Sequence, residues 1–259
     1  MKIPLYQVDA FTSRLFGGNP AAVCPLEAWI DDRTMQAVAA ENNLAETAFF
    51  VGGEGRYDLR WFTPAVEVDL CGHATLASAF VIFEHLEPSL EAVSFRSKSG
   101  DLRVTRSGDL LTLDFPAWRP SRCEPDEALT RALGAAPQEV WASHDYMAVY
   151  ASEDDVRGLQ PAMDQVAAID RFAVIVTAPG RDADFVSRFF APRQGIPEDP
   201  VTGRAHCTLV PYWARRLART RLRARQVSRR GGELFCEDRG DRVAIGGHAV
   251  QFLEGTVEV

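Results

Sequence analysis

The chain contains two copies of a short acidic run that ends at a glycine and is followed by a long apolar segment. The clearer copy spans residues 198–203 and the fainter one residues 67–72, a shift of 131 positions. In each copy a single polar side chain follows the glycine. A helix that starts at such a glycine has unpaired amides and the positive end of its dipole at its N-terminus, which favours an anion there. The sequence therefore predicts two similar units, each with a helix N-terminus aimed at a ligand.

The rest of the two halves matches in the same order, with a shift that grows slowly along the chain. Small loop insertions produce such a drift, so we interpret the chain as an internal duplication. The matches are Met35, Val38, Ala39 and Ala40 with Met163, Val166, Ala167 and Ala168, and Arg60, Phe62 and Pro64 with Arg188, Phe190 and Pro192, at a shift of 128; Glu67, Gly72 and Ala74 with Glu198, Gly203 and Ala205 at 131; and Gly100, Leu102, Gly108 and Asp109 with Gly232, Leu234, Gly240 and Asp241 at 132.

The repeat predicts an α/β (α+β) fold of two pseudo-symmetric lobes. Each lobe is expected to be a curled, barrel-like, mostly antiparallel sheet around a central apolar helix. Residues 74–86 are apolar on nearly every face, and residues 205–217 occupy the corresponding place, so both segments are expected to be buried helices. The lobes are expected over residues 1–116 and 117–259, with the extreme C-terminus packing back on the N-terminal lobe. A site in a cleft between the lobes follows from this arrangement.

Local patterns predict several other elements. Residues 31–43 have the spacing of a short amphipathic helix, and residues 92–97, 102–106 and 110–115 are expected to be successive strands. A tight turn is expected at residues 17–20, where two glycines precede Asn19 and Pro20. The proline-rich run 116–125 is the expected linker between the lobes.

The composition excludes some classes of partner. The chain has 259 residues and a formal net charge of −8, which gives no general reason to expect nucleic acid or an anionic membrane. Residues 215–230 are a local exception, because they contain eight arginines and no acid. This strip could bind phosphate, but we favour a solvated helix end that continues into the exposed face of a strand.

The cysteines and the chain start indicate a cytoplasmic protein. There are five cysteines, an odd number without a C-x-x-C spacing, so neither a disulfide framework nor a zinc site is indicated. The first residues lack the apolar core of a signal peptide, and the longest apolar run, residues 74–83, is shorter than the roughly 20 residues of a membrane span. We therefore expect a cytoplasmic protein that binds no metal.

Three ionisable residues near the predicted helix N-termini are candidates for catalysis. Glu46 opens a strand among apolar neighbours, and a partly desolvated carboxylate is suited to act as a general acid or base. His73 follows the glycine of the first copy, and Asp199 lies in the acidic run of the second. Each alone has an ordinary structural explanation as a strand-end acid, a helix-start residue or a turn former. The argument for a catalytic role therefore rests on the three residues taken together.

The corresponding positions of the two copies narrow the reaction type. Cys71 is matched by Thr202 and His73 by Arg204, so the pair of thiols that a two-thiol racemase needs is absent. One-base proton transfer or isomerisation is the better interpretation. Cys71 could be a reactive thiolate at a helix start, although a small packing residue is favoured. We discount the adjacent pair 206–207 as a metal site, because neighbouring helical side chains diverge.

Six motifs, in order along nearly the whole chain, carry a family resemblance. The chain resembles the phenazine biosynthesis PhzF-like family, which has the diaminopimelate epimerase-like fold. The motifs are Val8-Asp9-Ala10-Phe11, Gly18-Asn19-Pro20-Ala21-Ala22-Val23, Glu46-Thr47-Ala48-Phe49, Arg60-Trp61-Phe62-Thr63-Pro64, Cys71-Gly72-His73-Ala74-Thr75 and Glu198-Asp199-Pro200-Val201-Thr202-Gly203.

The resemblance implies an activity and a set of site residues. It implies cofactor-independent isomerisation of a small carboxylate-bearing metabolite by proton transfer, and usually a homodimer. The family's acid/base glutamate matches Glu46, and its histidine and aspartate match His73 and Asp199, which orient and polarise the substrate. Substrate binding is expected to involve Asn19, Gly72, Gly203 and Arg204, the glycines through the amides around them.

One departure from the family pattern leaves three functions open. Arg204 stands where the family usually has a serine, and its guanidinium could pair with an extra substrate carboxylate, pair with Asp199 or Glu46, or fill the cleft. The leading hypothesis is a PhzF-like isomerase. The alternatives are an amino-acid epimerase or racemase, and a non-catalytic metabolite-binding protein in which Arg204 blocks the cleft.

Overall fold

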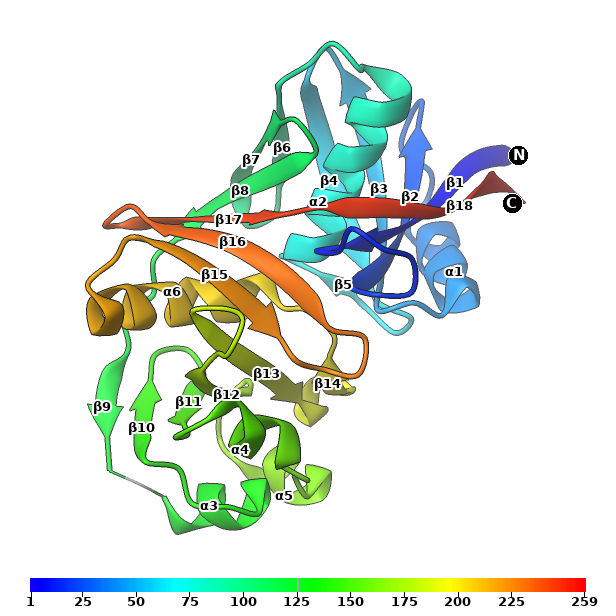
Figure 1. Ribbon diagram of the computed structural model, residues 1–259. Coiled ribbons are helices and arrows are strands. Elements are labelled where there is room, and N and C mark those ends of the chain that lie inside the picture. Colours follow the sequence, from blue (N-terminus) through cyan, green and yellow to red (C-terminus); the bar gives the residue numbers. More distant parts are fainter. Residues whose placement is uncertain (125) are drawn as a thin grey trace. The chain divides into compact units, whose positions relative to one another are not determined.

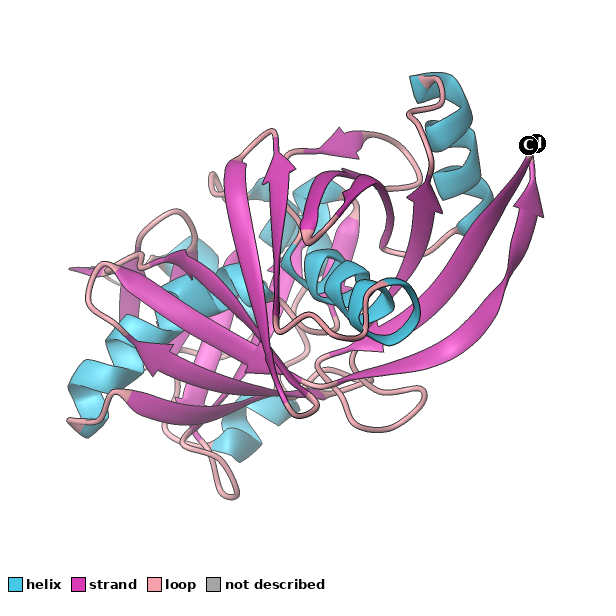
Figure 2. Cartoon of the chain, turned by 90° about the horizontal axis from the view of Figure 1, so that it is seen from above, coloured by secondary structure: helices cyan, strands magenta, loops and turns pink. Residues whose placement is uncertain are grey.

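The computed structural model of the protein describes residues 1–124 and 126–259, which divide into two compact units. Unit 1 comprises Met1–Asp114 and Gly246–Val259, and unit 2 comprises Phe115–Ile245. Both units combine strands and helices (Figure 1), and strands predominate (Figure 2). Among the described residues, no helix combines the length and the apolar character that crossing a bilayer requires.

Unit 1 contains a buried helix and most of the predicted strands. Its elements in chain order are β1 (Lys2–Ala10), β2 (Asn19–Leu26), α1 (Asp32–Asn42), β3 (Glu46–Gly53), β4 (Arg56–Phe62), β5 (Glu67–Val68), α2 (Gly72–Val81), the π-helix η1 (Ile82–Leu86), β6 (Ala92–Ser97), β7 (Gly100–Ser107), β8 (Leu110–Pro116) and, at the C-terminus, β18 (Ala249–Glu258).

Unit 2 has more helices than unit 1. Its elements are β9 (Ser121–Cys123), α3 (Glu127–Leu133), β10 (Glu139–Ala142), β11 (Tyr146–Val149), α4 (Glu153–Gly158), α5 (Met163–Ala168), β12 (Val174–Pro179), β13 (Phe185–Ala191), the 3-10 helix η2 (Pro192–Gln194), β14 (Ile196–Asp199), α6 (Gly203–Leu217), β15 (Arg221–Gln226), β16 (Gly232–Asp238) and β17 (Arg242–Gly247). The expected linker therefore contains a strand, β9, and its last residue, Pro125, lies outside the described residues.

The strands of the two units pair in the same order. In unit 1, β1–β2, β3–β4, β4–β5 and β6–β7 are antiparallel, whereas β2–β3 and β4–β6 are parallel. In unit 2, β10–β11, β12–β13, β13–β14 and β15–β16 are antiparallel, whereas β11–β12 and β13–β15 are parallel. The predicted α/β class with mostly antiparallel strands is confirmed, and the sheet is open rather than closed into a barrel.

Strand β18 was not expected from the sequence. Most of its residues are exposed, so it lacks the alternation of buried and exposed positions that indicates a strand. Its backbone pairs with β1 along the whole of β1, which brings the two chain ends side by side (Figure 1). Strand β18 therefore forms because it pairs with β1, and not because its own sequence alternates between apolar and polar residues.

The two apolar helices are buried, as the sequence predicts. In α2 only Gly72 and Phe80 are not fully buried, and the helix packs against β1, β2 and β3. Helix α6 is buried from Ala205 to Ala214 and contains Pro211, whose ring removes one backbone donor from the helix. The carbonyl of Cys207, four residues earlier, accepts a hydrogen bond of 2.8 Å from the amide of Trp118 instead. The proline therefore leaves no unpaired carbonyl.

The acidic runs are anchored by arginines on the preceding strands. In unit 1, Arg60 of β4 donates two hydrogen bonds to Glu67 of β5, at 2.7 and 3.0 Å. In unit 2, Arg188 of β13 donates two to Glu198 of β14, at 2.8 and 3.0 Å. Two parallel bonds of this kind fix direction as well as distance. Each pair therefore positions the segment that leads into the following helix.

At least four of the eight arginines in the arginine-rich strip form ion pairs with acids of unit 2. This supports the favoured interpretation of a solvated face. The ion pairs are Arg216 with Glu139, Arg219 with Asp184, Arg221 with Glu237, and Arg223 with Glu233.

The first turn of helix α6 contains a buried histidine, His206. His206 is fully buried, and its Nδ1 lies 2.8 Å from the carbonyl oxygen of Thr202, the residue that caps the helix. Burial lowers the pKa of His206 to about 4. In α2, Thr75 makes the corresponding bond to the carbonyl oxygen of Cys71, at 2.5 Å. Both side chains stabilise a helix start.

We expect His206 to make folding pH-dependent. Because its folded-state pKa lies below the ordinary value of about 6.5, its contribution is complete above that pH and is lost as the pH falls towards 4. The loss at pH 5 is about 2 kcal/mol. Urea unfolding at pH 8 and pH 5 measures it, with His206→Asn as the variant that cannot titrate there. Equal pH dependence of the two proteins would contradict this assignment.

Candidate functional site

Glu46 lies at the start of β3, in the interior of unit 1. Only 8% of the residue is exposed, and the neighbouring strand β2 places Ala21 opposite it in parallel register. The strand residues that follow Glu46, up to Phe50, are buried as well. The sequence therefore places a carboxylate where water is scarce, as predicted from its apolar neighbours.

His73 is the second residue of α2, and the helix start fixes its position. Cys71 precedes the helix with an extended backbone, and its carbonyl oxygen accepts the bond from Thr75 that closes the first turn. His73 is buried, with 5% of the residue exposed.

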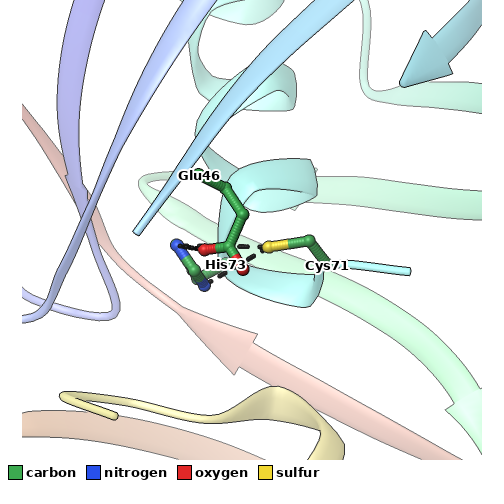
Figure 3. Close-up of side chains that lie close together, drawn as sticks. All are labelled: Glu46, Cys71 and His73. Carbon is green, nitrogen blue, oxygen red and sulfur yellow. Dashed lines mark hydrogen bonds and ion pairs between the residues drawn. The ribbon is translucent and has the colours of Figure 1, made fainter. Parts of the chain in front are cut away.

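The structure brings Glu46 and His73 into contact (Figure 3). Nε2 of His73 lies 3.1 Å from Oε2 of Glu46. The atoms are not aligned as a hydrogen bond, and Oε2 has no other hydrogen-bond donor among the described residues. The contact is therefore an ion pair when the imidazole is protonated, and Oε2 accepts no hydrogen bond in it.

Two further side chains contact the other side of the imidazole ring. Asn19 Nδ2 lies 3.1 Å from Nδ1 of His73. The Cys71 sulfur, drawn in Figure 3, lies 3.5 Å from the same nitrogen. In the neutral imidazole, with Nδ2 of Asn19 as the donor, Nδ1 accepts and Nε2 carries the proton that faces Glu46. The sequence predicted Asn19 in a turn and, from the family resemblance, as a substrate-binding residue, and it favoured a packing role for Cys71 over a reactive thiolate. The structure brings both to His73.

The surroundings of this group change its pKa values. Burial lowers the pKa of His73, but the neighbouring Cys71 and Glu46 raise it, and the net direction is upward. Burial, followed by the charge of Glu46, raises the pKa of the Cys71 thiol to about 11. The thiol is therefore neutral at pH 7, and the Glu46 carboxylate is the charge that favours the imidazolium.

The same three side chains carry atoms of the types that bind metal ions. A carboxylate oxygen, a thiol sulfur and an imidazole nitrogen from Glu46, Cys71 and His73 lie within 4.8 Å of one another. Sequence spacing did not reveal this set, because the glutamate comes from a different element than the other two residues.

In unit 2, Asp199 lies at the end of β14 just before the start of α6. Its carboxylate accepts a hydrogen bond from the Thr202 hydroxyl, and both residues are buried. Gln226 spans this turn, since its amide oxygen accepts from the Thr202 amide at 2.9 Å and its nitrogen donates to the Asp199 carbonyl at 2.8 Å. The loop that leads to Gly203 is therefore held rigidly.

Arg204, the second residue of α6, pairs with an acid that the sequence analysis did not consider. Its Nη2 lies 3.2 Å from Oδ1 of Asp145, a fully buried carboxylate. Its guanidinium lies 4.8 Å from the ring centre of Trp118 and 4.4 Å from that of Phe172. No sequence motif surrounds Asp145, so the sequence did not identify it as the partner of Arg204. Its burial in the structure is the feature that singles it out.

Comparison with known proteins assigns the family. The family model of phenazine biosynthesis-like proteins, PhzC-PhzF, matches residues 8–255. The chain belongs to this family. It is 50% identical over 259 residues to an uncharacterized isomerase of Pseudomonas aeruginosa, and the match covers 100% of both chains. The expectation of an isomerase is confirmed at the level of this PhzF-like family.

Solved structures confirm the fold of this PhzF-like protein. A PhzF family protein of Enterococcus faecalis is 47% identical, with a TM-score of 0.98 and 100% of both chains covered. A hydroxyproline epimerase of Agrobacterium vitis is 11% identical and has a TM-score of 0.64 over 99% of this chain and 91% of that one. The second likeness concerns the fold alone.

We expect Gly18 to be essential for the position of Asn19. Its φ is +60°, and a Cβ there would lie 2.1 Å from the Ala10 carbonyl oxygen, which is backbone and cannot move aside. Gly18→Ala should therefore cost about 2 kcal/mol or more of unfolding free energy, measured by urea unfolding. Gly53→Ala is the control, because nothing lies within 4 Å of its Cβ position. Equal stability of the two variants would contradict this expectation.

Proposed function

We propose that this PhzF-like protein is a cofactor-independent isomerase that moves a proton on a small carboxylate-bearing metabolite, with Glu46 as the acid/base. The buried Glu46–His73 contact, 3.1 Å between Nε2 and Oε2, is the observation that carries the proposal. A carboxylate in a water-poor site is a stronger base towards a substrate than a hydrated carboxylate. Oε2 of Glu46 accepts no hydrogen bond from the described residues, so it has a lone pair that can accept a proton.

In the proposed reaction Glu46 takes a proton from a carbon of the substrate and becomes a carboxylic acid. The electron pair left behind is delocalised into the adjacent unsaturated or carboxylate group. His73 and the first amides of α2, around Gly72, donate to the oxygens on which negative charge develops. Glu46 then returns the proton to a different carbon, so the step conserves protons and electrons and needs no co-reactant.

Asn19 has a supporting role in this scheme. Its contact with Nδ1 holds the imidazole ring so that Nε2 faces Glu46. We propose that Asn19 also contributes to substrate binding through this orientation. A fixed ring loses little entropy when the charge on the substrate develops.

The family resemblance also suggests roles for three residues of unit 2, which we propose as follows. Asp199 orients and polarises the substrate, and the amide at Gly203 binds a carboxylate at the N-terminus of α6. Arg204 is proposed to bind a further substrate carboxylate. Its ion pair with Asp145 and its contacts with two aromatic rings support a fixed guanidinium in this role.

An amino-acid epimerase or racemase is the second candidate. The Cys71 sulfur lies 3.5 Å from Nδ1 of His73, which offers a second group that can carry a proton. Loss of optical activity together with solvent exchange of the α-proton would distinguish this reaction from isomerisation. The third candidate, a non-catalytic binding protein, would bind carboxylates without any exchange.

We also propose that the two units arose by duplication, and that the protein is a cytoplasmic homodimer. The shared strand order and the corresponding Arg60–Glu67 and Arg188–Glu198 pairs support duplication. The family resemblance supports the dimer, and the absence of disulfides among the described cysteines fits the cytoplasm.

Glu46→Gln should abolish proton exchange. The protein is incubated in D2O with a panel of small dicarboxylates and aryl carboxylates, and loss of C–H signals is followed by proton NMR. Because acid/base groups contribute about 10²–10⁴-fold, the variant should exchange at least about 100 times more slowly than the natural protein.

Glu41→Gln is the matched control, since Glu41 is an exposed acid of the same unit. It should exchange at the natural rate. Full turnover by Glu46→Gln would show that another group moves the proton. Binding of panel members without exchange by the natural protein would favour the non-catalytic function.

A further inference from the structure

We propose that Gln226 is a positioning residue of the enzyme, which holds the Asp199 carboxylate and the start of α6 in place. The inference rests on the proposed function, in which Asp199 and the amide at Gly203 contact the substrate. Gln226 is 1% exposed, so it acts on that site through its neighbours and not by touching the substrate. All of these residues belong to unit 2.

The backbone of Gln226 is fixed from both sides. It is the last residue of β15, where it lies opposite Ser187 of β13 in parallel register and opposite Gly232 of β16 in antiparallel register. The next amide, that of Val227, donates to the Ser187 carbonyl at 2.8 Å. A strand end that is paired on both sides gives the side chain a rigid base.

The carboxamide of Gln226 bonds to the loop before α6 with both of its ends. Oε1 accepts from the Thr202 amide at 2.9 Å. Nε2 donates to the Asp199 carbonyl at 2.8 Å and to the Thr202 hydroxyl oxygen at 3.1 Å. A carboxamide combines acceptor and donors on one planar group, whereas a carboxylate has no donor and an apolar side chain has neither. The three bonds therefore depend on a carboxamide at this position.

These bonds also set the direction of the Thr202 hydroxyl. Because Nε2 of Gln226 donates to the hydroxyl oxygen, the hydroxyl proton points to the Asp199 carboxylate, which accepts the hydrogen bond. The carboxamide, the hydroxyl and the carboxylate thus form a chain in which each group donates to the next. In a buried site each bond of such a chain polarises and strengthens its neighbour. Gln226 therefore fixes both the backbone and the side chain of Asp199.

The same chain keeps the Thr202 side chain away from the helix amides. Thr202 is the N-cap residue of α6, and an N-cap threonine usually accepts a bond from an amide of the first turn. Among the described residues of that turn, no amide donates to the Thr202 side chain. Its hydroxyl is engaged by Gln226 and Asp199 instead. The start of α6 is therefore left to the proposed substrate carboxylate.

The test compares the natural protein with Gln226→Met, which keeps the length of the side chain and removes its three bonds. The values of kcat and KM are measured for a panel member that the natural protein exchanges in D2O. We expect Gln226→Met to lower kcat/KM by about 100-fold, because a displacement of about 1 Å in an active site costs about that much. Both constants should change, since in the proposed function Asp199 polarises the substrate and the amide at Gly203 binds its carboxylate.

A double-mutant cycle shows whether Gln226 and Thr202 act as one unit. Thr202→Val removes the hydroxyl and should lower kcat/KM, whereas Thr202→Ser keeps the hydroxyl and should keep most of the activity. Adding Gln226→Met to Thr202→Val should lower kcat/KM by less than about 10-fold more, because residues of one hydrogen-bond network are not additive. Fully additive losses would overturn the proposal. Where Gln226→Met does not fold, equal activity of the serine and valine variants would overturn it.

Tyr150→Phe is the structural control. Tyr150 is another buried residue of unit 2, and its hydroxyl donates to the Ala135 carbonyl at 2.9 Å. Loss of this bond should lower the urea midpoint of unfolding but leave kcat/KM unchanged. Unchanged kcat/KM in Gln226→Met would overturn the proposal. An equal loss of kcat/KM in Tyr150→Phe would overturn it as well, because general destabilisation would then explain both variants.

The natural protein separates this role from the proposed function. Exchange by the natural protein with unchanged kcat/KM in Gln226→Met would overturn the positioning role alone. Absence of exchange with every panel member would contradict the isomerase, and calorimetry on a panel member that binds then decides the role of Gln226. Its affinity should fall by about 10-fold or more in Gln226→Met, as expected for hydrogen bonds to a charged group. Neither exchange nor binding by the natural protein would contradict both proposals.

Discussion

The buried contact between Glu46 and His73 is the interaction on which the proposed chemistry depends. Neither residue is more than 8% exposed, and an isolated charge in such a place is costly because it loses its hydration. Each group therefore needs the other. The pair also joins the start of β3 to the first turn of α2, which are distant in sequence. A change that moves either element disturbs both the local stability of unit 1 and the proposed proton transfer.

The surrounding fold explains how the contact is maintained. Gly18 places Asn19 against the imidazole ring, Thr75 closes the first turn of α2, and parallel pairing with β2 holds the start of β3. Unit 2 uses similar means for different side chains. Gln226 fixes the turn before α6, where Arg204 pairs with buried Asp145. The same backbone plan thus carries a histidine in one unit and an arginine in the other.

The sequence predicted the features that depend on periodicity and on glycine. The apolar faces of α2 and α6 required burial, and the glycines at residues 72 and 203 marked the helix starts. Features that depend on tertiary contact were missed. Strand β18 has no buried face of its own, and the pairing of Arg204 with Asp145 joins residues far apart in the chain. The sequence favoured a packing role for Cys71. Its contact with His73 depends on the direction of the two side chains at the helix start, and the spacing of residues in the sequence does not define that direction.

A crystal structure of the protein with a bound carboxylate from the D2O panel tests the role of Glu46 most directly. Reacting atoms in productive complexes lie about 3–3.5 Å apart. If Glu46 moves the proton, the acidic carbon of the ligand lies within about 3.5 Å of its carboxylate, with the ligand carboxylate at the first amides of α2. The proposed mechanism would be contradicted by a ligand whose exchanging carbon lies out of reach of Glu46, with the Glu46 carboxylate still covered by His73.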